Sequence, residues 1–109
     1  MKSSKRAKLE KAGWKVGTAA EFLGLTPEEE SFLEMKSALA MALRKKREAK
    51  RLTQSQLAKL IGSSQPRVAL MEAADSSVSV DLLVRSLLAI GATRRELARV
   101  IGSGSGTSS

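Results

Sequence analysis

Residues 26–101 are divided into short segments by residues that start and stop helices. Thr53, Ser79 and Thr93 each precede an apolar segment, and a hydroxyl at this position accepts a hydrogen bond from a helix's first turn. Gly62 and Gly91 each follow such a segment, where glycine supplies the left-handed turn that ends a helix. Aromatic residues make up 3% of the chain and β-branched residues are sparse, which favours packed helices over sheets.

The longest predicted helix begins at Thr26. This threonine, Pro27 and Glu29 have the pattern of a capping box, and nothing stops the helix before Arg51. Three-to-four-residue spacing predicts its buried stripe: Phe32, Met35 or Lys36, Leu39 and Leu43. Either one long helix or two joined by a kink near residues 34–37 fits this pattern, and we favour one.

Four shorter helices are predicted to follow. They span residues 54–61, a segment ending near Glu72, residues 80–90 and residues 94–101. Either Ser64 or Gln65 caps the second of these, because Pro66 disfavours helical dihedral angles at Gln65. Residues 18–23 read as one or two further helical turns. The predicted fold class is therefore all-α, with an N-terminal helical extension.

The composition excludes several kinds of chemistry. Cysteine and histidine are both absent, so disulfides, zinc sites with these ligands, and cysteine or histidine nucleophile pairs are excluded. The only carboxylate cluster, residues 28–30, is explained by the start of a helix. No apolar run approaches the roughly 20 residues that span a bilayer. We therefore expect a cytoplasmic protein with no catalytic activity, no metal, no cofactor and no membrane partner.

The net charge of +8 is confined to one part of the chain. Residues 1–35 hold six lysines and arginines and six acidic residues, whereas residues 36–101 hold thirteen and five. A localised basic surface indicates a polyanionic partner, although a solvated basic face explains the charge about as well.

The segment of residues 52–72, LTQSQLAKLIGSSQPRVALME, has the spacing of a helix-turn-helix. Ala58 must be small because the second helix crosses there, and Gly62 supplies the positive φ of a tight turn. The residues expected to face the core are Leu57, Ile61, Val68 and Met71. Gln65, Arg67 and Ala69 are left on the free face of the second helix, with Leu70 at its margin.

This segment resembles the phage-repressor (Xre/Cro-type) family, and the resemblance covers residues 39–90. Its most specific residues are Thr53-Gln54, Leu57-Ala58, Gly62 and Glu72. The resemblance implies a five-helix lambda-repressor-like DNA-binding domain. In that family the second helix of the motif enters the major groove and the first crosses the phosphate backbone.

Residue roles follow from the resemblance. Gln54 would hold a phosphate, Gln65 would read a base edge, and Arg47 would pair with Glu72 beside a phosphate. Arg67 would grip either a guanine or a phosphate, the alternatives being about even. The other DNA-binding candidates are Thr53, Lys59, Ser64 and Leu70, of which Leu70 either contacts a thymine methyl or is partly buried in the core.

The chain departs from this family at residues 73–75. Relatives usually carry glycine near Ala74, where the recognition helix ends in a left-handed turn. A residue with a Cβ there costs roughly 1 kcal/mol or takes another geometry. The loop through Ser76 and Ser77 is therefore left open.

The extension before the domain resembles that of small HigA-like antitoxins. In those proteins the chain neutralises a toxin and represses its own operon. The resemblance implies a toxin-binding or dimerising surface, whose candidates are Trp14, Phe22, Leu25, Phe32 and Leu33. Equally, these side chains pack over the domain as a small second core, with Leu82 and Leu88 as the receiving surface.

These observations predict three regions: an extension (residues 1–35), a helix-turn-helix DNA-binding domain (36–101) and a disordered Gly/Ser-rich tail (102–109). The expected function is that of a sequence-specific transcriptional regulator that binds a palindromic operator as a homodimer, because one recognition helix reads few base pairs. An antitoxin is the particular regulator that the extension favours. The alternative is a protein-interaction module, a toxin neutraliser with weak or nonspecific DNA binding.

Overall fold

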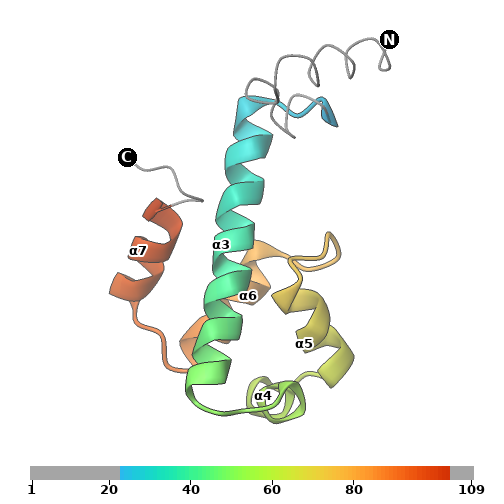
Figure 1. The fold of residues 1–109 in the computed structure, drawn as a ribbon, viewed down its shortest axis with the longest axis vertical. Coiled ribbons are helices and arrows are strands. Elements are labelled where there is room, and N and C mark those ends of the chain that lie inside the picture. Colours follow the sequence, from blue (N-terminus) through green and yellow to red (C-terminus); the bar gives the residue numbers. More distant parts are fainter. Residues whose placement is uncertain (1–22, 104–109) are drawn as a thin grey trace. The chain divides into compact units, whose positions relative to one another are not determined.

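The computed structural model describes residues 23–103, which form an all-α chain (Figure 1). Its helices are α3 (Pro27–Ala49), α4 (Gln54–Ile61), α5 (Gln65–Glu72), α6 (Val80–Ala89) and α7 (Arg94–Ser103). The chain forms two compact units, Met1–Leu33 and Glu34–Ser109, and the boundary between them lies within α3. The predicted all-α fold is confirmed, and residues 27–49 form one helix rather than two.

The described part of the first unit contains the start of α3. The Thr26 N–H donates to Glu29 Oε1 (2.8 Å) and the Glu29 N–H donates to Thr26 Oγ1 (3.1 Å), so the predicted capping box is present. The predicted turns at residues 18–22 lie outside the described residues. Of the candidate partner-binding residues, Trp14 and Phe22 also lie outside them.

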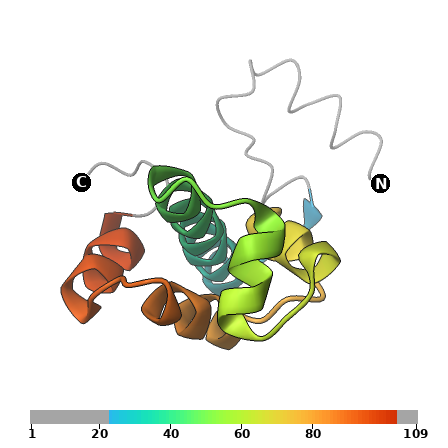
Figure 2. The same cartoon turned by 90° about the horizontal axis from the view of Figure 1, so that it is seen from below.

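The second unit is built around α3. Figures 1 and 2 show α7 on one side of this helix and the pair α4–α5 on the other, with α6 between them. Each helix contributes aliphatic side chains to one core, whose most deeply buried members are Leu39, Leu43, Leu57, Val68, Met71, Val78, Leu83 and Leu87. All aromatic residues of the chain precede residue 34, so this core is entirely aliphatic.

The buried stripe of α3 contains Lys36, one of the two predicted alternatives, and does not extend to the predicted Phe32. Lys36, Leu39, Ala40 and Leu43 are buried, whereas Met35 is half-buried and Phe32 is 47% exposed. Lys36 replaces an apolar residue because its aliphatic stem packs inward while its ammonium donates to the carbonyl oxygen of Asp75 (2.8 Å). This bond ties α3 to the end of α5.

Four helices end in the same local geometry. Shortly after each helix, one residue has a positive φ, and the N–H of the next residue donates to the carbonyl five residues before it. The residues with positive φ are Arg51 (56°), Gly62 (68°), Ala74 (54°) and Gly91 (107°). Of the two alternatives left open at Ala74, the structure has the left-handed one. The helix α3 ends two residues before its predicted end because Arg51 is left-handed.

Two other predicted ends differ from the structure. The helix α6 ends at Ala89, with Ile90 as its C-cap, one residue earlier than predicted. The helix α7 continues to Ser103, so the first two residues of the predicted tail are helical, and the Ser103 hydroxyl donates to the Val100 carbonyl (3.0 Å). Residues 104–109 of the predicted tail lie outside the described residues.

Candidate nucleic-acid interface

The helices α4 and α5 have the bounds expected of a helix-turn-helix, and each begins with a capped N-terminus. Thr53 and Gln56 form a capping box on α4, with N···O distances of 2.8 and 3.0 Å. Ser64, not Gln65, caps α5 by accepting from the Arg67 N–H (3.3 Å). The α5 cap places Pro66 in the first turn, where its missing N–H costs nothing.

The crossing of α4 and α5 depends on small and apolar side chains. Ala58 is 4% exposed, and Leu57, Val68 and Met71 are completely buried. Ile61 is only partly buried at the edge of this core. The turn between the helices passes through Gly62, whose positive φ lets the chain reverse within three residues. The opposite side of α5 is thereby fixed as the side that faces away from the core.

A bidentate ion pair joins α3 to the end of α5. Arg47 Nε and Nη2 donate to the two carboxylate oxygens of Glu72, at 2.6 and 3.0 Å. Arg47 Nη1 also donates to the Leu52 carbonyl (2.8 Å), so the guanidinium additionally holds the link that leads into α4. The side chains of Arg47 and Glu72 are 13% and 5% exposed. The hydrogen bond to Glu72 raises the pKa of Arg47, so this residue stays charged.

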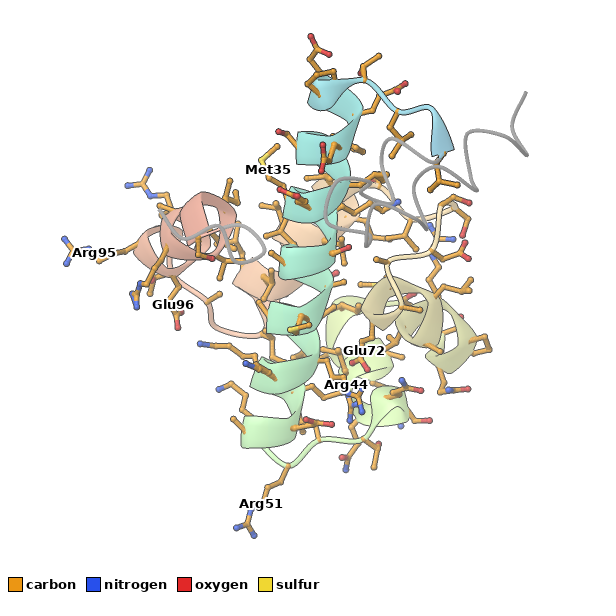
Figure 3. All side chains as sticks on the ribbon, turned by 45° about the horizontal axis from the view of Figure 1, so that its top comes forward. Met35, Arg44, Arg51, Glu72, Arg95 and Glu96 are labelled. Atoms are coloured by element: carbon orange, nitrogen blue, oxygen red, sulfur yellow. The ribbon has the colours of Figure 1, made fainter. Side chains whose placement is uncertain are left out.

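This ion pair continues into two glutamines. Gln54 Nε2 donates to Glu72 Oε1 (3.1 Å), and Gln54 Oε1 accepts from Gln65 Nε2 (2.7 Å). Four polar side chains from α3, α4 and α5 therefore form one connected chain that ends at the exposed Gln65. Figure 3 shows Glu72 in the space between α5 and α3.

These hydrogen bonds give Gln54 two contacts that the sequence did not predict. The side chain predicted to hold a phosphate has its amide nitrogen on Glu72 and its amide oxygen on Gln65. The amide group of Gln54 therefore holds the side chain of Gln65 at the start of α5. The sequence pattern could not reveal this contact, because Gln54 and Gln65 come together only through the angle at which α4 and α5 cross.

The remaining predicted residues lie around Gln65. Thr53, Lys59, Ser64 and Arg67 are exposed. Leu70 is 39% exposed, so it is partly buried and still reaches the outer side of α5. Arg67 forms no ion pair among the described residues, which leaves its charge available to a partner.

Two residues that the sequence did not single out shape the edges of this surface. Arg51 occupies the left-handed position after α3, and its side chain points away from the domain (Figure 3). Asp75 accepts from both the N–H (2.9 Å) and the hydroxyl (2.5 Å) of Ser77, and these bonds lower the pKa of Asp75. The loop after α5 is therefore ordered by its own side chains, where the sequence left its geometry open.

Comparison with known proteins identifies the family. A helix-turn-helix domain family matches residues 19–94, most of the chain, and the chain belongs to that family. Searches of curated proteins and of solved structures gave no match. Membership in this family supports a DNA-binding regulator, in agreement with the motif and its basic surroundings.

Two further searches concern other kinds of function. No helix within residues 23–103 is long and apolar enough to cross a membrane. In the same part of the chain, no three acidic side chains lie close enough together to hold a metal ion.

Proposed function

We propose that this protein is a sequence-specific transcriptional regulator of the phage-repressor (Xre/Cro) type that acts in the cytoplasm and has no catalytic role. The observation that carries the proposal is the hydrogen-bonded chain from Arg47 through Glu72 and Gln54 to Gln65. A side-chain amide held at the start of an exposed helix presents a donor and an acceptor together, which is the pattern that adenine offers in the major groove.

The basic charge of the second unit supplies the other part of the interaction. Phosphate contacts position a protein on DNA, whereas base contacts specify the sequence. Arg67 lies two residues from Gln65 on the same exposed helix, and Lys59 is exposed on α4. In this proposal Gln65 reads a base, Lys59 contacts phosphate and Arg67 contacts a guanine or a phosphate.

A binding measurement with matched variants tests this proposal. The probe is a labelled fragment of the DNA upstream of the protein's own coding sequence, and affinity is followed by fluorescence anisotropy. We expect Gln65→Ala and Arg67→Ala to weaken binding by about 10- to 100-fold, the range for loss of one bidentate base contact.

Arg85→Ala is the matched control for Arg67→Ala. It removes the same charge from an arginine on α6 whose side chain is 73% exposed and pairs with Asp81. A regulator that reads sequence loses far more affinity from Arg67→Ala than from the control. Equal losses, with a salt dependence that is the same on unrelated DNA, would reduce the chain to a nonspecific binder.

A more particular proposal concerns the extension, which resembles that of HigA-like antitoxins. Phe32 and Leu33 are 47% and 43% exposed, and large exposed apolar side chains favour a protein partner. The partner would be a toxin encoded beside this gene, and the regulator would repress the operon that encodes both.

Coexpression tests the antitoxin role. The neighbouring open reading frame should arrest growth when expressed alone, and coexpression of this chain should restore growth. Phe32→Ala or Trp14→Ala should lose the rescue while retaining affinity for the promoter fragment. Absence of a growth-arresting neighbour would leave the regulator and remove the antitoxin.

A further inference from the structure

The outward side of α3 carries an ordered set of side chains that the DNA-binding surface does not use. Glu34, Ala38, Met41 and Lys45 follow one another at spacings of four, three and four residues. At about 100° per residue they lie within an arc of about 60°. This arc is opposite the buried stripe of Lys36, Leu39, Ala40 and Leu43. We refer to Glu34, Ala38, Met41 and Lys45 as the α3 outer face.

The centre of this face is apolar and uncovered. Met41 is 58% exposed, the most exposed large apolar side chain in the described part of the second unit. A hollow of about 290 Å³ lies beside it between α3 and the C-terminal part of α7. The hollow is lined by all four residues of the face together with Val100 and others. Ile101, next to Val100, is 37% exposed.

The two ends of the face are oppositely charged. Glu34 and Lys45 are 11 residues apart, or about 16 Å along the helix, so they do not reach each other. Neither Glu34 nor Lys45 forms an ion pair within residues 23–103. In contrast, two neighbouring cations of α3 are paired: Arg44 with Glu48, and Lys46 with Glu96. The face therefore consists of an acid, a small residue, a large apolar residue and a base, in that order.

The order of these four side chains along α3 is complementary to the same order read in the opposite direction. In an antiparallel pair of identical helices, residues whose numbers have the same sum lie opposite each other. The sum of 34 and 45 equals the sum of 38 and 41. A second α3 related by a two-fold axis near residues 39 and 40 therefore sets Glu34 against Lys45 twice, and Met41 against the small Ala38 twice. Two-fold dimers require this kind of self-complementary surface.

We propose that the α3 outer face is the homodimer interface, occupied by the same face of a second copy of this chain. The proposal deepens the regulator proposed above and rests on it, because a palindromic operator requires two recognition helices related by a two-fold axis. In Figure 2 the helices α7, α6, α4 and α5 form an arc around part of α3, and within residues 34–103 no other helix covers the remaining side. Dimerisation through it leaves Gln65 and Arg67 exposed in both copies.

Charge reversal tests the interface. In a dimer of Glu34→Lys, the introduced lysine faces the partner's Lys45 twice. In a dimer of Lys45→Glu, the introduced glutamate faces the partner's Glu34 twice. We expect each variant to raise the dimer dissociation constant by about tenfold or more, because both symmetric pairs change from attraction to repulsion. Sedimentation equilibrium of the full chain at low ionic strength measures these constants.

An equimolar mixture of the two variants provides the decisive measurement. The two lysines on the face of one chain then lie opposite the two glutamates of the other, so the mixture should recover the dissociation constant of the wild type. The double variant E34K/K45E keeps the net charge and should dimerise with itself. A wild-type chain that is monomeric, single variants that dimerise like the wild type, or a mixture no tighter than its components would each overturn the proposal.

Binding to a single half-site separates this result from the proposed function. A fragment with one half-site needs only one recognition helix, so Glu34→Lys, which should not dimerise, should bind it no more weakly than the wild type does. Loss of dimerisation with intact half-site binding leaves the regulator in place, whereas Gln65→Ala affects half-site binding and leaves the dimer unchanged.

Discussion

The surface formed by α4 and α5 and the α3 outer face hold their polar side chains in different ways. On the first, Gln65, Gln54 and Glu72 are joined to each other and to Arg47 by hydrogen bonds of 2.6–3.1 Å. On the second, Glu34 and Lys45 form no ion pair among the described residues. Side chains ordered before binding lose less entropy when they bind, which suits recognition of a rigid pattern such as a base edge.

Glu34 and Lys45 lack an ion pair within residues 23–103, which indicates another kind of partner for the α3 outer face. A charge that has no partner within the chain gains one only from a surface that carries its opposite at the matching distance. In the proposed dimer, the α3 outer face of a second copy of this chain is that surface. The contrast between the two regions predicts that substitutions in the first change folding and affinity together, whereas substitutions in the second change association alone.

The largest effect on stability is expected from breaking the Arg47–Glu72 ion pair beside the α4–α5 surface. Glu72→Ala should lower the free energy of unfolding by about 3 kcal/mol, because it leaves a largely buried guanidinium without its carboxylate. Urea denaturation followed by circular dichroism measures the change. Asp81→Ala is the matched control: it breaks an Asp–Arg pair whose side chains are 75% and 73% exposed, and should cost at most about 1 kcal/mol. Equal losses would mean that Arg47 does not depend on Glu72.

A smaller effect is expected from releasing Gln65 without removing it. Gln54→Ala removes the acceptor for Gln65 Nε2, so the amide that faces solvent is no longer held. We expect an affinity loss of about tenfold on the promoter fragment, corresponding to one hydrogen bond of about 1.4 kcal/mol. Ser55→Ala changes the exposed neighbour on the same helix and should leave affinity unchanged. An unaltered affinity in Gln54→Ala would show that Gln65 needs no support.

The end of α5 should respond in the opposite direction. Ala74 has a φ of 54°, where a Cβ is unfavourable, so Ala74→Gly should raise the free energy of unfolding by about 1 kcal/mol. Ala73→Gly, one residue earlier at a φ of −92°, should lower it because glycine there gains only chain entropy in the unfolded state. Chemical denaturation of the two variants, side by side, tests whether the sign changes between neighbouring positions.

The smallest effect concerns the pH dependence of stability, through the ion pair between Lys46 on α3 and Glu96 on α7. The hydrogen bond from the Lys46 ammonium, with that from the Thr93 N–H, lowers the pKa of Glu96. A lowered pKa in the folded state contributes stability above the unfolded value of about 4.3, which is lost as pH falls through the folded value. Between pH 5 and 3, Glu96→Gln should therefore show a shallower fall in melting temperature than the wild type. Parallel curves would exclude a contribution from this pair.

Much of the fold could be predicted because its signals are local. Thr26, Thr53 and Thr93 each stand three residues before a Glu or Gln, and all three form the reciprocal bonds of a capping box. The bounds of α4 and α5 follow from such caps and from Gly62. The end of α3 could not be predicted in this way, because Arg51 has no local preference for the left-handed conformation that it adopts.

The residues of the candidate site could be predicted, but not all of the hydrogen bonds that join them. The resemblance to the phage-repressor family singles out Arg47, Gln54, Gln65 and Glu72, and the structure brings the four together. The partners of Gln54 depend on how α4, α5 and α3 cross, which no residue pattern encodes. The choice between Met35 and Lys36 in the buried stripe is a similar case, since it depends on the carbonyl of Asp75, 39 residues away from Lys36. The DNA-binding and partner-binding roles of the predicted residues remain predictions.

The repeated helix end also affects how this chain reaches its native state. Links of four, three, seven and four residues join α3 to α7 in order, and each begins with a turn that is closed by bonds within its own helix end. Contacts that are near in sequence form early, because little loop entropy is lost in making them. Helical domains of this kind fold within microseconds to milliseconds. We therefore expect a nascent chain to complete the α4–α5 unit as soon as both helices have left the ribosome, before α7 has been synthesised.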